Sequence, residues 1–201
     1  MEDTTKTVFD LEEFPALVLL TDALEKNYGD VFAYTMSTIM QKPFGSVTRT
    51  PGVWDKDDAD AFVGTMPDEW INGLVPNWHN YLLAFKKQQH ADDSKLMDIL
   101  KPYIPMMNMC GLSLLKPNAV IAPHTDNDTT SKFNKLAYHF NIVGKGSKIT
   151  VIDQVFSQDP MNHLVFDSGY THSVVNGPQV RVLLYIDFDV AMARQDPDEW
   201  K

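Results

Sequence analysis

Three side chains of metal-ligating type stand in the second half of the chain: His124, Asp126 and His172. Two imidazoles and one carboxylate can hold a divalent iron ion on one face and leave the opposite coordination positions open, an arrangement typical of non-heme iron oxygenases. Arg181 follows within the apolar run 180–188, where a buried cation is costly unless an anion meets it. These four residues predict a metal site with a place for an anionic ligand beside it.

The spacing His-x-Asp is a weak indicator by itself, because the chain contains it twice. At 90–92 it lies in a polar stretch that continues a predicted helix, where residues two apart point about 200° apart and cannot chelate one ion. We expect solvated surface there. His124 and Asp126 instead end the apolar run 120–123, where extended geometry puts both side chains on one face. That placement allows shared coordination; a loop histidine with Asp126 capping a turn is the alternative.

The last two apolar runs predict a β-hairpin with its turn at 176–179. In that register His172 and Arg181 are diagonal neighbours on one face, roughly 7 Å apart at the backbone. A short dicarboxylate could span that gap. An internal carboxylate such as Asp187 or Asp153 is the alternative partner for Arg181.

Hydrophobic spacing separates the chain into two regions. Apolar residues three or four apart predict helices at 14–25, 31–40 and 68–85, and the Pro- and Gly-rich stretch 43–60 between them predicts a long loop. From about residue 106 the pattern changes to short β-branched and apolar runs bounded by turn residues, at 109–115, 119–122, 136–143, 148–152, 163–166, 171–175 and 180–188. About seven such strands favour an antiparallel sandwich or barrel.

We therefore expect an α+β protein in two parts. A mainly helical region, 1–105, packs on the barrel and partly covers it, and residues 106–201 form the barrel that carries the chemistry.

Composition excludes several classes of protein. Hydrophobic residues make up 44% and charged residues 22% of 201 residues, as in an ordinary globular domain. The net charge of -10 comes with no cluster of lysine or arginine, so a nucleic-acid partner is not expected.

Features of the chain that depend on its compartment favour the cytoplasm. Cys110 is the only cysteine, which excludes an intramolecular disulfide and a cysteine-rich zinc site and fits a reducing environment. The first residues are acidic, and the early apolar run 16–20 is far shorter than a signal sequence or a membrane span requires. We expect a cytoplasmic protein without a membrane anchor.

With these residues together, the second half resembles the catalytic domain of the aspartyl/asparaginyl β-hydroxylase family, a branch of the Fe(II)/2-oxoglutarate oxygenases. The resemblance runs from about residue 111 to 188. It rests on motifs in matching order and approximate spacing: Leu114-Leu115-Lys116-Pro117 ahead of Pro123-His124-Thr125, then Tyr138-His139-Phe140-Asn141-Ile142-Val143, then Phe166-Asp167-Ser168-Gly169-Tyr170-Thr171-His172, and finally Arg181-Val182-Leu183. It implies a double-stranded β-helix, the jelly-roll, cupin-like form of these oxygenases.

The resemblance also implies roles for single residues. His124 and His172 would bind Fe(II), Arg181 and Ser113 would bind the distal carboxylate of 2-oxoglutarate, and His139 would help to hold its other end. Ordinary structural roles, as a core histidine and a strand serine, remain alternatives for His139 and Ser113.

Two positions depart from the family pattern. Members that act on epidermal-growth-factor-like domains have glycine where this chain has Asp126, so the full triad is restored here, as in the family's bacterial amino-acid hydroxylases. Where an arginine lies two residues before the matched histidine, this chain has Ala137. Lys135 or Asn134 could take over that arginine's contact with the inner carboxylate.

The activity implied is hydroxylation of an amino-acid-like substrate by dioxygen, coupled to oxidative decarboxylation of 2-oxoglutarate. The substrate is a free amino acid or an aspartyl, asparaginyl or prolyl side chain, with a small molecule favoured. Arg49, Trp54 and the loop 156–161 are candidate substrate contacts because of their positions alone. A cupin-type metal enzyme that uses no 2-oxoglutarate and a non-catalytic module that binds a carboxylate are the competing interpretations.

Overall fold

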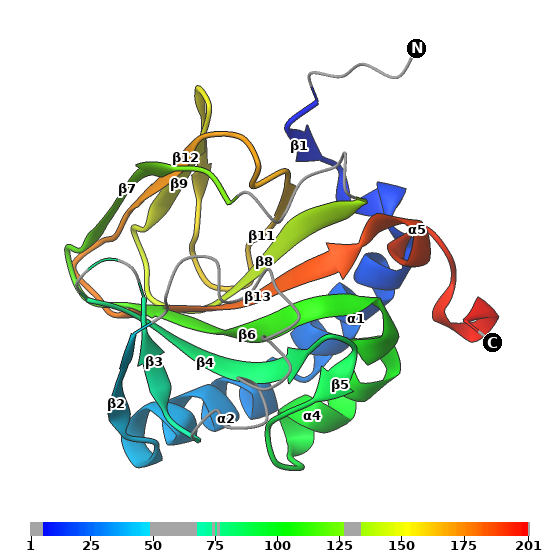
Figure 1. Ribbon diagram of the computed structural model, residues 1–201, viewed down its shortest axis with the longest axis horizontal. Helices are drawn as coiled ribbons and strands as arrows, with labels where there is room; N and C mark the ends of the chain where they lie inside the picture. The colour runs from blue at the N-terminus through cyan, green and yellow to red at the C-terminus, as the bar shows by residue number, and fades with distance from the viewer. Residues whose placement is uncertain (1–5, 49–67, 74, 76, 127–133, 201) are drawn as a thin grey trace.

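Two facing sheets and a layer of helices build the protein (Figure 1). The structure is a computed structural model that describes residues 6–48, 68–73, 75, 77–126 and 134–200. Its helices are α1 (Pro15–Lys26), α2 (Tyr28–Gln41), α4 (Lys95–Leu100) and α5 (Val190–Ala193), with 3-10 turns at Leu11–Glu13, Lys101–Met106 and Pro197–Glu199. Its strands are β1 (Val8–Phe9), β2 (Phe44–Thr48), β3 (Trp70–Asn72), β4 (Trp78–Phe85), β5 (Gln88–Gln89), β6 (Met107–Leu115), β7 (Val120–His124), β8 (Lys135–Val143), β9 (Lys148–Val151), β10 (Gln154–Ser157), β11 (His163–Phe166), β12 (His172–Val175) and β13 (Arg181–Asp189).

From β6 onward the chain alternates between the two sheets, except that the consecutive strands β9 and β10 both belong to the smaller sheet. The larger sheet has the order β1-β11-β8-β13-β6-β4-β3-β2, and the smaller has the order β10-β9-β12-β7. Thus β6, β8, β11 and β13 belong to one sheet, whereas β7, β9, β10 and β12 belong to the other. This alternation is the winding of a double-stranded β-helix, so the predicted α+β class with a jelly-roll, cupin-like core is confirmed.

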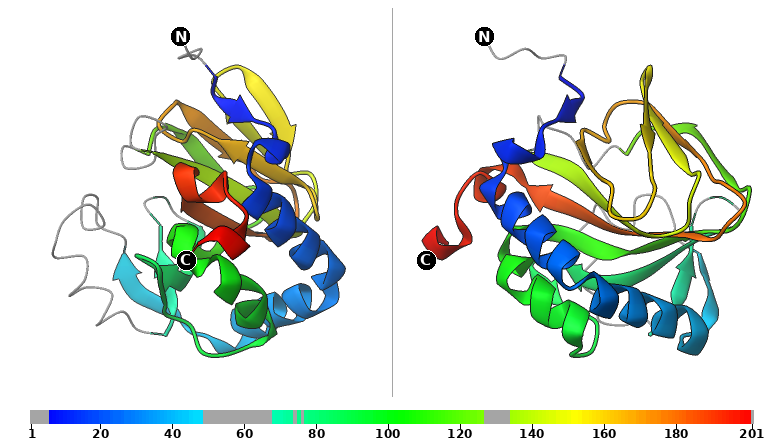
Figure 2. Two further views of the ribbon diagram at one scale, coloured as in Figure 1. Left: turned by 90° about the vertical axis from the view of Figure 1, so that its right-hand side faces the viewer. Right: turned by 180° about the vertical axis from the view of Figure 1, so that it is seen from behind.

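Alternation of side chains along the strands of the larger sheet creates two separate cores. On β13, Val182, Leu184, Ile186 and Phe188 pack against the helices, together with Leu17 and Leu20 of α1 and neighbouring residues. The opposite face of the larger sheet points between the sheets, where Ile121, Ile149, Phe166 and Val174 are buried in a smaller core. The helices cover only the outer face of the larger sheet, as Figures 1 and 2 show. The interior between the sheets is therefore left for the site.

The predicted hairpin between the last two strands is wrong. β12 pairs with β7 and β9, and β13 pairs with β6 and β8. The segment 176–179 thus carries the chain from one sheet to the other. His172 and Arg181 consequently reach the interior from opposite sheets, not as neighbours on one face.

The predicted helix at 68–85 is also wrong. Most of this segment forms β3 and β4, and β4 pairs with β6 from Trp78↔Leu115 to Phe85↔Met109. The predicted helical continuation through 90–92 is absent as well, because these residues lie in a non-helical connection. The first part of the chain therefore extends the larger sheet in addition to covering it. Within the described residues, no helix is both long and apolar enough to cross a membrane.

Candidate metal centre and carboxylate pocket

His124 and His172 face each other across paired strands of the smaller sheet. Their positions are register partners between β7 and β12, and their rings lie 4.3 Å apart between centroids. Asp126 follows β7 and is held by a hydrogen bond from its backbone N–H to Ser168 O (2.8 Å). The ligand atoms of the three side chains all lie within 4.8 Å of one another. The structure thus brings the three predicted ligands together.

Both imidazoles are oriented by the backbone two residues upstream. Nδ1 of His124 is 2.9 Å from Ala122 O, and Nδ1 of His172 is 3.0 Å from Tyr170 O. Because a carbonyl only accepts, each Nδ1 carries the proton, and in the neutral ring Nε2 is left with a free lone pair. Burial lowers the pKa of His172, against the opposing effect of Asp126, which favours this neutral form.

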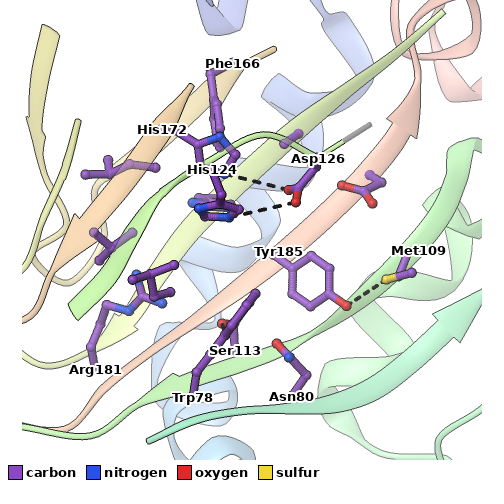
Figure 3. Close-up of a pocket in the computed structure, with 16 residues that line it drawn as sticks. Trp78, Asn80, Met109, Ser113, His124, Asp126, Phe166, His172, Arg181 and Tyr185 are labelled. Carbon is purple, nitrogen blue, oxygen red and sulfur yellow. Dashed lines mark hydrogen bonds and ion pairs between the residues drawn. The ribbon is translucent and has the colours of Figure 1, made fainter. Parts of the chain in front are cut away.

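The two Nε2 atoms point at the same carboxylate. Nε2 of His124 is 3.9 Å from Asp126 Oδ1, and Nε2 of His172 is 3.7 Å from Asp126 Oδ2 (Figure 3). Metal–ligand bonds of about 2.1 Å place neighbouring ligands about 3 Å apart, so each imidazole needs to approach the carboxylate by less than an ångström. The donor set and its geometry fit a divalent metal ion.

A cavity between the sheets extends from these residues to Arg181. Its empty volume is about 670 Å³, which includes the open solvent at its mouth. The lining residues are Trp78, Asn80, Met109, Ser113, Ile121, His124, Asp126, Ala137, His139, Ile149, Phe166, His172, Val174, Arg181, Tyr185 and Asp187. All six predicted site residues therefore line one cavity, with the metal-ligating group contributed by the smaller sheet and Arg181, Ser113 and His139 by the larger.

Arg181 is a buried cation with spare hydrogen-bonding capacity. It is 2% exposed, and its Nη1 donates to Gln158 Oε1 at 2.6 Å, whereas its Nε has no acceptor among the described residues. Burial lowers the pKa of Arg181 to about 9, so the guanidinium is still charged at neutral pH. Among the residues that the structure describes, its hydrogen-bond partner is the neutral amide of Gln158, not the internal carboxylate considered from the sequence. Such a group is suited to meeting an anion.

Ser113 and His139 stand beside Arg181 on the same sheet. Ser113 Oγ accepts a hydrogen bond from Trp78 Nε1 at 2.8 Å, so its own proton is left to donate elsewhere. Burial, with smaller contributions from Arg181 and His172, holds the pKa of His139 well below its usual value. His139 is therefore a neutral ring on the cavity wall.

Other expected site residues lie outside the cavity wall. Lys135 and Asn134 are not among the lining residues, and Asn134 Nδ2 instead donates to Asp189 Oδ1 (2.8 Å). None of the residues 156–161 lines the cavity, while Arg49 and Trp54 lie outside the described residues.

The sequence pattern does not indicate several of the residues that line the cavity. Trp78 and Asn80 lie in the predicted helix at 68–85, and Tyr185 lies in the apolar run 180–188. Only the alternation along β4 and β13 could have placed them on the face of Ser113 and Arg181.

Comparison with known proteins places the chain in a family. A family model for aspartyl/asparaginyl β-hydroxylase matches residues 48–190, well over half of the chain. The chain belongs to this family. A protein of Acanthamoeba polyphaga mimivirus, "Uncharacterized protein L888", is 42% identical over 196 residues, which is 94% of this chain and 72% of the viral protein. The family match begins at the last residue of β2 and ends at the first residue of α5, so it includes β3, β4 and β5, which the first part of the chain adds to the larger sheet.

Cupins are found among solved structures with a similar fold. KdgF from Halomonas sp. matches with a TM-score of 0.42 and 12% identity, over 60% of this chain and 87% of that chain. An RmlC-like cupin from Shewanella frigidimarina matches with a TM-score of 0.40 and 9% identity, over 58% of this chain and 79% of that chain.

Proposed function

We propose that this protein is an Fe(II)- and 2-oxoglutarate-dependent dioxygenase that hydroxylates an amino-acid-like substrate. Membership of a hydroxylase family and a possible His-Asp-His metal site support the oxygenase part of this proposal. The observation that carries the finer part is that a buried, charged Arg181 lines the same cavity as the three metal-ligating side chains. A dicarboxylate that chelates the metal at one end needs such a cation at the other.

His124, Asp126 and His172 would hold the iron. Bound there with 2-oxoglutarate and dioxygen, it would supply the oxidation that converts a C–H bond of the substrate to an alcohol while succinate and carbon dioxide are released. As the resemblance to the family implies, the remaining tasks of the protein are to bind and orient the co-substrate and the substrate and to exclude water.

Arg181 and Ser113 would bind the distal carboxylate of the co-substrate. Arg181 brings the charge, and Ser113 brings a hydroxyl proton that Trp78 leaves free. The apolar side chains Ile121, Ile149 and Val174 on the facing sheet keep this end of the cavity dry, which strengthens the ion pair.

The substrate would occupy the part of the cavity farther along β13. Met109 pairs with Asp187 in the sheet register, six residues from Arg181, and Asn80 and Tyr185 line the same wall. The polar side chains of Asn80, Tyr185 and Asp187 fit the polar ends of a free amino acid or of an aspartyl, asparaginyl or prolyl side chain. Arg49 and Trp54 stay candidate contacts from the sequence.

The decisive experiment is anaerobic reconstitution with Fe(II) and 2-oxoglutarate, followed by admission of oxygen and measurement of succinate. The twenty amino acids are screened for stimulation first, and short peptides next. We expect iron-dependent succinate that a substrate increases. Its complete absence with every substrate, while iron is bound, would contradict the proposal and leave a non-catalytic carboxylate-binding module.

Arg181→Met separates this function from that of a cupin-type enzyme without 2-oxoglutarate. The variant should lose succinate formation by at least a hundredfold and still bind iron, since methionine replaces the buried cation with an apolar side chain of similar length. Arg194→Met, at an exposed position, is the matched control. Unchanged turnover in Arg181→Met would favour the cupin-type enzyme.

A further inference from the structure

Gln158 lies between the two groups that are proposed to grip the co-substrate. It belongs to the connection between β10 and β11, is 1% exposed, and does not line the cavity. Its side-chain oxygen is 2.6 Å from Arg181 Nη1, and its side-chain nitrogen is 3.4 Å from His139 Nδ1. A single buried amide thus touches both residues from behind.

Arg181 dictates which way this amide faces. A guanidinium only donates, so the atom of Gln158 beside Nη1 must be the oxygen. Ser147, 0% exposed, points its Oγ at the same oxygen at 3.3 Å. The amide oxygen thus faces two donors, and the amide nitrogen must face His139.

The amide in turn dictates the tautomer of His139. An amide nitrogen only donates, so Nδ1 of His139 must accept, and the proton of the neutral ring is on Nε2. His139 therefore offers a donor at Nε2 to the cavity that it lines. Reversing the amide would set two donors against each other at Arg181 and remove this preference at His139.

The neutrality of Gln158 is as important as its geometry. A glutamate at this position would form a buried ion pair with Arg181 and cancel the charge that an anionic ligand needs. Glutamine holds the guanidinium through one nitrogen and leaves its charge uncompensated, with Nε still lacking an acceptor.

The backbone fixes Gln158 in this place. Its N–H donates to Ser147 O at 2.8 Å, tying the connection after β10 to the turn before β9. This contact holds the amide before any ligand arrives, so less side-chain entropy is lost on binding.

We infer that Gln158 is a positioning residue that presets both halves of the carboxylate pocket, the free donors of Arg181 and the Nε2 proton of His139. This inference rests on the proposed co-substrate and adds to it a residue that touches neither the metal nor the ligand. Gln158 acts through its two partners and selects for a ligand with carboxylates at both ends.

The test is Gln158→Glu, which keeps the shape of the side chain and adds one charge. Binding is measured by calorimetry on the full chain loaded with Mn(II) without oxygen, using 2-oxoglutarate and 2-oxovalerate. The second compound keeps the 2-oxo acid end but lacks the distal carboxylate. We expect the Kd for 2-oxoglutarate to rise at least tenfold and that for 2-oxovalerate to change less than threefold. Gln154→Glu, an exposed glutamine on β10, is the matched control.

A double variant distinguishes positioning from general damage. In an Arg181→Met background, Gln158→Glu should weaken 2-oxoglutarate binding by less than threefold, because the larger part of its effect passes through Arg181 and only the part that passes through His139 remains. Equal loss for both 2-oxo acids, or unchanged binding of 2-oxoglutarate, would overturn the inference.

If Gln158→Glu does not fold, Gln158→Met tests the same inference. It removes both hydrogen bonds without adding charge and should weaken 2-oxoglutarate binding three- to tenfold. Nitrogen chemical shifts of His139 in the metal-free protein should show Nε2 protonated in the wild type and a mixture of tautomers in the variant. An unchanged tautomer of His139 together with an unchanged affinity for 2-oxoglutarate would contradict the inference.

The outcomes for the two proposals can be told apart, because this assay measures binding and not turnover. A wild-type protein that binds 2-oxoglutarate through Arg181 but forms no succinate with any substrate would refute the oxygenase and support the role of Gln158. Succinate formation by a Gln158→Glu variant that binds 2-oxoglutarate normally would support the oxygenase and refute the role of Gln158. A wild type without affinity for 2-oxoglutarate would refute both.

Discussion

At four functional residues of the cavity, one polar atom is bonded to the protein and another is left for a ligand. His124 and His172 bond through Nδ1 to carbonyls two residues upstream, and each keeps Nε2. Ser113 accepts from Trp78 and keeps its proton. Arg181 bonds to Gln158 through Nη1 and keeps Nε. Side chains held in this way lose little entropy when they bind a ligand, which is how a site is preorganised.

Removal of the carboxylate ligand should weaken the metal site without disturbing the fold. In Asp126→Ala the hydrogen bond from the backbone N–H to Ser168 O is retained, while one of three ligands is lost. We expect affinity for Mn(II) or Fe(II) to fall more than tenfold in anaerobic calorimetry. Asp92→Ala changes the other His-x-Asp sequence and should leave metal affinity unaltered. Equal metal affinity in the Asp126 variant and the wild type would contradict the proposed ligand set.

Trp78→Phe should weaken binding of 2-oxoglutarate through Ser113. Loss of the indole N–H frees the Ser113 oxygen, so the hydroxyl can donate to other acceptors and is no longer reserved for the ligand. Net hydrogen bonds of this kind contribute about 1 kcal/mol, which corresponds to a three- to tenfold rise in Kd. Ser113→Ala should show a similar rise, and the double variant should not exceed the larger single effect. Additive losses would show that Trp78 acts by a different route.

At the scale of elements, strand positions could be predicted from the sequence but their partners could not. Each of the seven predicted runs from 109 to 188 overlaps a strand, because β-branched and apolar runs between turn residues are a local signal. Which sheet a strand joins depends on how the chain winds, and nothing local to 172–181 distinguishes a hairpin from a crossing between sheets.

The wrong helix at 68–85 has a similar cause. Trp70, Leu74, Trp78 and Leu82 are four apart, and a spacing of four places residues on one face of a strand as well as near one face of a helix. The short strand β10 was missed because only Phe156 in it is even partly buried. Gln158 was inaccessible from the sequence, since a glutamine in a connection carries no signal until its partners are known.

The turn between β8 and β9 should be sensitive to the loss of Gly144. This residue has φ +94°, and a Cβ there would lie 2.4 Å from Val180 O and 2.9 Å from the Cα of Arg181. We expect Gly144→Ala to lower the free energy of unfolding by more than about 1 kcal/mol and to weaken 2-oxoglutarate binding, because the Arg181 backbone must move.

Gly29→Ala in α2 is the matched control for the turn. Apart from its chain neighbours and the nearby backbone of its own helix, no atom lies within 4 Å of its added Cβ, and alanine favours helix over glycine by up to about 1 kcal/mol. Urea denaturation should therefore show opposite signs for the two substitutions. A neutral Gly144→Ala variant would mean that the turn adapts and that the tight contact under Arg181 is not required.

At the scale of the molecule, the two faces of the larger sheet divide the work. Its outer face packs on the helices through side chains such as Leu184 and Phe140, and the burial of these side chains stabilises the fold. Its inner face carries Arg181, His139 and Ser113, which are polar groups held in a mostly apolar interior. This division explains why the predicted site residues coincide well with the cavity: a charged residue in an apolar strand is a signal that survives an error in strand pairing.

Buried histidines should make the stability of the whole protein fall in mild acid. Burial lowers the pKa of His79, His139 and His172, so below about pH 6.5 the unfolded chain takes up protons that the folded chain does not. The free energy of unfolding is then greatest above pH 6.5 and declines as the pH falls towards the lowered values, by up to about 1.4 kcal/mol per pH unit for each such histidine. His79, 8% exposed and not among the residues that line the cavity, allows a clean measurement on metal-free protein. Between pH 7.5 and 5.5, urea denaturation should show that the free energy of unfolding of His79→Gln declines less steeply than that of the wild type. His163→Gln, at an exposed position on β11, should follow the wild-type curve. A decline of wild-type steepness in both variants would show that other groups take up the protons.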